Sequence, residues 1–420
     1  MNIPSIFFKE EELEDVYETS GKKIRVPTNQ TQYSFETKEN LQSFIKNQFP
    51  TKLEQEKYKM YRNEWHRRAK NFDAGNFPLA VCIELVSTCN LSCSMCYTIT
   101  KDFQNTVTGA QRMLPWKIVT KIIDEASELG VFSLLFSWRG ESTLYRSYDE
   151  NKNLKTFPDV LKYAREKGIL EITSLTHGQE IDEDMAKKIV EAEPSWISFS
   201  FDGIEDTYNS IRTPTKWKGK NYNAFEVVVK RLKRLIEIRN SMGKKRPQIR
   251  SNTIYPAIAK DPMRYYNLLK GLGVDMITVN ELLDLRNGVP DEDSINNNWA
   301  CQYPFQRLTI SANGTILPCT GAHKEESGLV LGLYEGTEMK KLKNVDGSYQ
   351  NLKLEHHTIK SAWNCDKIKN IRNLHASGER CKINPGCKNC SHGYKKHGFN
   401  RNHSEWDEKK QSWANEERIG

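Results

Sequence analysis

Residues 80–96 read Ala-Val-Cys-Ile-Glu-Leu-Val-Ser-Thr-Cys-Asn-Leu-Ser-Cys-Ser-Met-Cys, a short apolar run that leads into three closely spaced cysteines. The run Ala80–Val86 has the length and composition of a buried strand. Cys89, Cys93 and Cys96 follow it with the spacing C-x3-C-x2-C. Three thiolates on one short loop can hold three irons of a [4Fe–4S] cluster and leave the fourth iron open. A structural zinc site prefers four ligands, commonly in CxxC pairs, and no fourth ligand lies nearby in the sequence. The spacing therefore predicts a cluster in preference to zinc.

Short apolar runs alternate with amphipathic segments from this stretch as far as residue 280. The expected strands are Ala80–Val86, Phe132–Ser137, Leu170–Ser174, Trp196–Phe201, Gln248–Thr253 and Met276–Asn280. The expected helices are Pro115–Leu129, Phe157–Lys167, Asp182–Ala192, Ala224–Met242 and Pro262–Leu272. This alternation predicts an α/β fold with a parallel sheet, and six strands suit a partial (β/α)6 barrel. Because active groups of parallel folds lie at the carboxyl ends of the strands, we expect the cysteine loop at the active end.

The composition narrows the functional class. The chain of 420 residues is 37% apolar and 28% charged, with ten cysteines and a net charge of +8. It has no run of 18 apolar residues and no basic, apolar start, so we expect a cytoplasmic protein without a membrane partner. In a reducing compartment, so many cysteines indicate metal or redox chemistry in preference to disulfides. Basic and acidic residues are interspersed, so nucleic acid is not an expected partner.

A second group of cysteines lies towards the C-terminus. Its members are Cys301, Cys319, Cys365, Cys381, Cys387 and Cys390. The first two flank a predicted hairpin, Phe305–Ile316, that turns at Asn313-Gly314. Zinc bound by the last three cysteines and His392 is one interpretation. It leaves the cysteines around the hairpin without a role, so a second iron–sulfur cluster is favoured.

These patterns divide the chain into four expected segments. An N-terminal helical extension covers residues 1–75 and includes a helix over Lys52–Lys70. The partial barrel covers 76–290, a small iron–sulfur domain that closes its open side covers 291–395, and a charged tail covers 396–420.

The cysteine loop after the first strand resembles the signature of the radical S-adenosylmethionine superfamily. The resemblance implies that S-adenosylmethionine binds the open iron through its amino and carboxylate groups. One electron from the cluster then cleaves it to methionine and a 5′-deoxyadenosyl radical, which abstracts hydrogen from a substrate carbon. An electron donor such as flavodoxin or ferredoxin is implied as well. The alternative from another class is an iron–sulfur protein that only transfers electrons or serves as a scaffold.

Further positions match the family's cofactor-binding residues. Gly140-Glu141 resembles the Gly-Gly-Glu segment that holds the methionine amino group, although Arg139 replaces the first glycine. Arg212 resembles the arginine that pairs with the methionine carboxylate. The other positions implied to lie near the cofactor are Met95, Thr176, Ser198, Ser200 and Asp202. A simpler interpretation remains open, in which the charged residues are solvated loop residues and Ser200 and Asp202 cap the next helix. No catalytic side chain is assigned.

The C-terminal cysteines resemble the SPASM and Twitch modules that hold auxiliary clusters. The implied ligands of one auxiliary [4Fe–4S] cluster are Cys301, Cys319, Cys387 and Cys390, with Cys381 as a substitute. Relatives with such modules act on peptides, protein side chains and sugars. The run Asn76–Glu84 is similar to members associated with bacterial surface polysaccharides, so oxidation or epimerisation of a sugar-type small molecule is the first expectation. A peptide substrate is the alternative, which the lack of a strand-rich pattern in the first 75 residues disfavours.

Overall fold

The computed structural model describes residues 45–99, 103, 113–216, 222–280, 300–325, 328–338 and 354–390. Outside these ranges it describes only the short strands β1 (Phe8–Lys9), β2 (Glu14–Thr19), β3 (Lys22–Pro27), β4 (Tyr33–Ser34), β16 (Leu342–Lys343), β17 (Tyr349–Gln350), β19 (Trp406–Asp407) and β20 (Ser412–Trp413).

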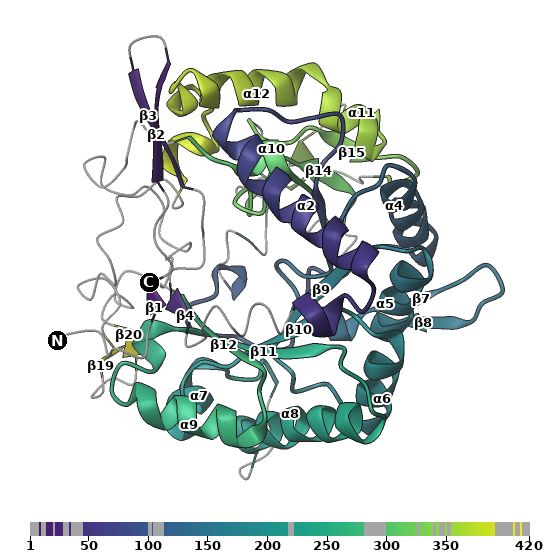
Figure 1. Cartoon of the computed structure of the whole chain (residues 1–420), viewed down its shortest axis with the longest axis vertical. Coiled ribbons are helices and arrows are strands. Elements are labelled where there is room, and N and C mark those ends of the chain that lie inside the picture. The colour runs from purple at the N-terminus through teal and green to yellow at the C-terminus, as the bar shows by residue number, and fades with distance from the viewer. Residues whose placement is uncertain are drawn as a thin grey trace.

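One curved sheet organises the molecule, and helices cover its outer side (Figure 1). Six of its strands are mutually parallel and stand in chain order: β5 (Ala80–Ile83), β6 (Ser133–Leu135), β9 (Glu171–Thr176), β10 (Trp196–Ser200), β11 (Gln248–Ile254) and β12 (Met276–Asn280). These six strands overlap the six expected ones, which confirms the partial (β/α)6 barrel.

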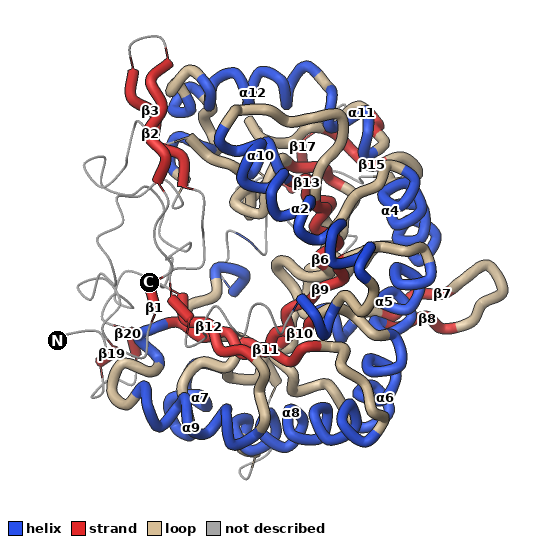
Figure 2. Tube along the Cα trace, viewed as in Figure 1, coloured by secondary structure: helices blue, strands red, loops and turns tan. Residues whose placement is uncertain are grey.

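Figure 2 shows the helices as a blue layer outside the red strands. Apolar side chains of these helices belong to the buried core. The helices are α4 (Trp116–Glu128), α5 (Phe157–Glu166), α6 (Glu183–Ala192), α7 (Glu205–Ile211), α8 (Ala224–Ser241) and α9 (Pro262–Leu272). Local sequence sets their ends. Asp261 caps the first turn of α9, and Gly273 ends this helix in the left-handed region at φ 88°.

Helix α2 (Lys52–Lys70) marks the end of the barrel opposite the cysteine loop. It begins with a capping box between Thr51 and Glu54. Its aromatic face packs against residues that precede or begin the parallel strands. These contacts join Tyr58, Tyr61 and Trp65 to Leu79, Phe132, Leu170 and Trp196. Because α2 covers the amino ends of the strands, their carboxyl ends form the opposite side, where the cysteine loop begins.

The C-terminal domain continues the barrel sheet from its first strand. Strand β13 (Arg307–Ile310) pairs in parallel with β5, and β14 (Thr315–Leu317) completes the predicted hairpin. The further elements are β15 (Gly332–Tyr334), β18 (His356–His357), α10 (Tyr303–Gln306), α11 (Ile359–Asn364) and α12 (Asp366–Ala376). The domain therefore extends the sheet at β5, one of the two strands that border the open side of the barrel. At the other edge, β12 pairs with β4.

The N-terminal region differs from the expected helical extension. It contains α2, but β2 and β3 also form an antiparallel pair, and β1 pairs with β4. In the C-terminal tail only β19 and β20 are described, and they pair with each other. None of the described helices is long and apolar enough to cross a membrane.

Candidate metal centres

The loop after β5 carries Cys89, Cys93 and Cys96, and the backbone fixes its course. The N–H of Cys96 donates to the carbonyl of Cys93 at 2.9 Å, and the N–H of Ser92 donates to the carbonyl of Thr213 at 2.7 Å. The second bond ties the loop to the segment after α7. The three thiols are therefore held on one short, anchored loop at the carboxyl end of β5.

Arg212 joins this loop to the end of β10. Its guanidinium forms an ion pair with Asp202, and Nη1 lies 3.5 Å from the sulfur of Cys93. The other oxygen of Asp202 accepts the N–H of Ile254 at 3.0 Å, so the carboxylate is anchored to β11 as well. Burial raises the pKa of the Cys93 thiol to about 11, and the Arg212 guanidinium opposes this rise. The positive charge thus favours the thiolate, which is the form that binds iron.

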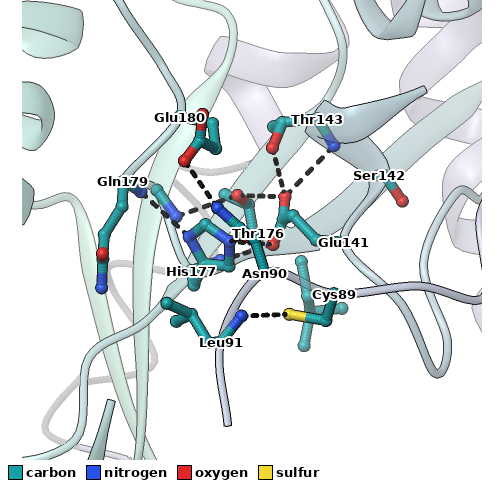
Figure 3. Close-up of polar contacts among 12 residues, drawn as sticks. Cys89, Asn90, Leu91, Glu141, Ser142, Thr143, Thr176, His177, Gln179 and Glu180 are labelled. Atoms are coloured by element: carbon teal, nitrogen blue, oxygen red, sulfur yellow. Dashed lines mark hydrogen bonds and ion pairs between the residues drawn. The ribbon is translucent and has the colours of Figure 1, made fainter. Parts of the chain in front are cut away.

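Glu141 is buried at the carboxyl end of β6 and accepts several hydrogen bonds (Figure 3). Its Oε1 accepts the hydroxyls of Thr143 and Thr176, both at 2.7 Å, and its Oε2 accepts the N–H of His177 at 2.9 Å. Burial alone would raise the pKa of Glu141, but the hydrogen bonds from the His177 backbone and from Thr143 and Thr176 outweigh it and hold the pKa below its usual value. A buried anion therefore lies next to the cysteine loop.

Asn90 and His177 connect the loop to the turn after β9, a contact that was not predicted from the sequence. Nδ1 of His177 accepts the N–H of Gln179 at 3.1 Å, so the proton of the neutral ring sits on Nε2. Nε2 donates to the side-chain oxygen of Asn90 at 2.8 Å, and Asn90 donates to Glu180 at 2.6 Å (Figure 3). Burial lowers the pKa of His177, which keeps this ring neutral.

Close packing of the backbone requires a glycine at position 140. A Cβ placed on it would lie 2.2 Å from the carbonyl oxygen of Val86 and 2.7 Å from that of Thr88. No side chain fits at this position, because these atoms belong to the backbone that leads into Cys89. The glycine therefore allows the turn that carries Glu141 to approach the cysteine loop.

Arg139 explains why the sequence departs from the family pattern just before Gly140. Its guanidinium binds Glu84, the residue after β5, through Nε at 2.8 Å and lies 2.9 Å from Glu325. The central carbon of the guanidinium lies 3.9 Å from the centre of the Trp138 ring. This buried network was not predicted. Two features of the sequence indicated it: Glu84 lies within a predicted apolar strand, and Arg139 replaces a glycine of the family pattern.

The remaining predicted cofactor residues lie around the same end of the sheet. Ser198 is buried within β10, Ser200 ends that strand, and Met95 packs against the core beside the cysteine loop. Ser200 and Asp202 do not cap the next helix, because the N-cap of α7 is Ile204 and no side chain bonds there. That alternative is wrong. Their contact with a cofactor stays a prediction.

The four predicted ligands of the auxiliary cluster converge on one cavity. Cys301, Cys319, Cys387 and Cys390 line it together with apolar side chains and His375. Burial raises the pKa of Cys301 and Cys387 well above that of a free thiol, and the neighbouring cysteines raise it further. Four thiols that converge in this way can bind as thiolates once positive metal ions lie between them, so this set fits a metal cluster.

The other cysteines of this region stand apart from the cavity. Cys381, the expected substitute, lies on a short 3-10 helix and is not among the lining residues. Cys365 lies between α11 and α12 and packs against the core. His392, part of the zinc alternative, lies outside the described residues. Among those described, no three His, Cys, Asp or Glu side chains are close enough to share one ion. In a four-iron cluster each thiolate binds a different iron, so wider spacing is expected.

Two protein families match this chain. A model of the radical SAM superfamily matches residues 83–246. A model of the iron–sulfur cluster-binding domain SPASM matches residues 301–391. Each match includes one of the two cysteine groups.

Two curated relatives share part of the sequence. Fe-coproporphyrin III synthase of Methanosarcina barkeri is 35% identical over 126 residues, which are 30% of this chain and 27% of that protein. The tungsten-containing aldehyde ferredoxin oxidoreductase cofactor-modifying protein of Pyrococcus furiosus is 23% identical over 208 residues, 48% of this chain and 51% of that protein. The matches thus span about half or less of these relatives.

A solved structure shares the fold. SuiB of Streptococcus suis, bound to its precursor peptide SuiA, superposes with a TM-score of 0.50 over 80% of this chain and 79% of that chain, at 14% identity. Identity this low is informative about the fold only. From the family matches and the two cysteine sites, we conclude that residues 83–246 form a radical S-adenosylmethionine domain and residues 301–391 form a SPASM iron–sulfur domain.

Proposed function

We propose that this chain cleaves S-adenosylmethionine reductively at the Cys89–Cys96 loop and uses the resulting carbon radical to abstract hydrogen from a substrate. The observation that carries the proposal is the convergence of three anchored thiols, buried Glu141 and Arg212 at the carboxyl ends of neighbouring strands. When bound, the cluster and S-adenosylmethionine supply the electron and the radical. An electron donor such as flavodoxin or ferredoxin is part of this proposal.

Different side chains would bind the charged groups and the nucleoside part of the cofactor. Glu141 is suited to pair with the ammonium group of the methionine part, because its carboxylate is buried and held ionised. Arg212 is suited to pair with the carboxylate, and Asp202 fixes its orientation. Met95, Thr176, Ser198 and Ser200 would surround the nucleoside part. Gly140 lets the Glu141 turn reach the loop.

For the C-terminal domain we propose one auxiliary [4Fe–4S] cluster bound by Cys301, Cys319, Cys387 and Cys390. Their convergence on one cavity supports this set, and Cys381 outside the cavity becomes the weaker candidate. Four thiolates fill all four iron positions, so a substrate cannot bind the cluster directly. Such a site suits the transfer of one electron from a substrate radical, which would make the net reaction an oxidation.

For the substrate we propose a sugar-type small molecule of surface-polysaccharide synthesis, which would be oxidised or epimerised. Its support is the similarity of Asn76–Glu84 to members associated with such genes. A peptide or protein substrate is the second candidate. The antiparallel pair of β2 and β3 favours it, since an extended peptide can bind by adding a strand to a sheet edge. The same pair removes the argument that the first 75 residues lack strands.

Deuterium transfer tests both the chemistry and the substrate. Reduced holoprotein is incubated with S-adenosylmethionine and candidate sugars or peptides that carry deuterium at defined carbons. Deuterium in 5′-deoxyadenosine identifies the substrate class, and the variant with Cys89, Cys93 and Cys96 all replaced by Ala is the control. If reduced wild-type protein with a full cluster content forms no 5′-deoxyadenosine under any condition, the electron-transfer or scaffold alternative is correct.

A further inference from the structure

His375 lies in the wall of the C-terminal cavity and connects two of its cysteines. Its side chain comes from the end of α12 and is completely buried. The backbone N–H of Cys301 donates to its Nδ1 at 3.0 Å. Its Nε2 lies 3.5 Å from the sulfur of Cys387. One ring thus contacts a cysteine before the hairpin and a cysteine at the end of the domain.

The contact with Cys301 determines the position of the ring proton. A backbone N–H can only donate, so Nδ1 of His375 must be unprotonated. The proton of the neutral imidazole then sits on Nε2, the nitrogen that faces the sulfur of Cys387. The geometry therefore defines an N–H···S hydrogen bond with the ring as donor, at 3.5 Å between Nε2 and the sulfur.

We propose that His375 donates a hydrogen bond to the Cys387 thiolate and so raises the reduction potential of the auxiliary cluster. The proposal rests on the ligand set proposed above. Reduction adds negative charge to a cluster and its sulfurs, and an N–H donor stabilises that charge. His375 is in this account a positioning residue that tunes the cluster and does not bind iron. A higher potential makes the site a better acceptor for a substrate electron.

Two substitutions separate the two contacts of the ring. In His375→Asn, the side-chain oxygen takes the place of Nδ1 and still accepts the Cys301 N–H, but nothing reaches Cys387. In His375→Gln, the longer amide places an N–H near the position of Nε2 and keeps a donor for the sulfur. The pair therefore distinguishes the sulfur contact from a general loss of packing, which both variants share.

The measurement is a redox titration of the holoprotein, followed by electron paramagnetic resonance. The signal that S-adenosylmethionine does not alter belongs to the auxiliary cluster. We expect a more negative midpoint potential in His375→Asn, a value near wild type in His375→Gln, and a full iron content in both. An unchanged potential in His375→Asn, or an equal shift in both variants, overturns the proposal.

Wild-type protein provides an independent test should a variant not fold. Pulsed hyperfine spectroscopy of the reduced auxiliary cluster should detect a proton that exchanges in D2O, together with weak nitrogen coupling. Strong nitrogen coupling would show that His375 binds iron directly, which contradicts the proposal. If the proposed ligand set is wrong, the result differs from both of these outcomes, because Cys387→Ala then leaves the spectroscopic signal of the auxiliary cluster unchanged.

Discussion

The guanidinium of Arg139 lies 2.9 Å from the carboxylate of Glu325, and both side chains are only 1% exposed. Arg139 directly precedes the Gly140-Glu141 turn, whereas Glu325 follows Cys319 in the C-terminal domain. Glu84, which directly follows β5, binds the same guanidinium and also accepts the N–H of Ala312 at 2.9 Å. This buried network joins the segments that carry the two proposed metal sites.

Arg139→Leu should destabilise the protein strongly. It leaves the carboxylates of Glu84 and Glu325 buried without their cation, which costs about 3–5 kcal/mol. Denaturant unfolding of the holoprotein measures this change. The exposed pair Lys121–Glu335 is the control, because Lys121→Ala should cost about 1 kcal/mol or less. Equal effects of the two variants would show that the buried network does not stabilise the fold.

The iron content tests the two cluster assignments. Anaerobically reconstituted protein should hold about eight irons in two four-iron clusters. Replacing Cys89, Cys93 and Cys96 together by Ala should leave about four, measured by iron and sulfide analysis. Cys381→Ala should keep about eight, since Cys381 lies outside the cavity. A content of about four irons and one zinc would contradict the auxiliary cluster.

Glu141→Gln should weaken the binding of S-adenosylmethionine by about 1.5–3 kcal/mol, because a charge-assisted bond to the ammonium group is lost. Equilibrium binding to the reconstituted protein measures the dissociation constant. Thr143→Val is the matched control, since it removes one hydrogen bond to the same carboxylate but keeps the charge. If both variants weaken binding equally, Glu141 only shapes the turn.

His323 should make stability depend on pH. Burial lowers the pKa of this ring from 6.5 to about 4, so the folded state binds its proton less readily than the unfolded chain. Stability is then fully present above pH 6.5 and falls as the pH drops towards 4, by at most about 1.4 kcal/mol per pH unit.

His323→Asn removes this titration and keeps a donor for the carbonyl of Gly321, which Nδ1 contacts at 2.8 Å. Thermal unfolding at pH 7.5 and pH 5.5 should therefore show a smaller loss of stability in the variant, by about 1 kcal/mol. Parallel pH profiles for the variant and the wild type would refute the assignment.

The double variant Cys387→Ala, Cys390→Ala should separate the two clusters. It should still cleave S-adenosylmethionine, because the Cys89–Cys96 loop is intact. We expect no product, or a product more reduced than that of wild type, because the electron acceptor is lost. Mass spectrometry of 5′-deoxyadenosine and product measures both steps. A wild-type yield of product would indicate a purely structural auxiliary domain.

Most of the architecture could be predicted from local sequence patterns. The six parallel strands, the helices between them and the hairpin after Cys301 follow from hydrophobic periodicity and turn residues, which act over a few positions. The Cys89–Cys96 spacing predicted the first metal loop for the same reason. Strands β1 and β4 were missed, since such short strands depend on partners such as β12 that lie far away in the sequence. Strands β2 and β3 form a local pair that was not predicted either.

Tertiary structure alone decided which distant side chains meet. The sequence indicated neither that β13 pairs with β5 nor that this pairing brings Glu325 to Arg139. The sequence likewise suggested Cys381 as a possible ligand. It did not indicate that His375 contacts Cys301 and Cys387. Spacing within a short loop fixes thiols relative to one another, because few dihedral angles separate them. Residues far apart in the chain are brought together only by sheet order and packing, so their contacts follow from the folded molecule.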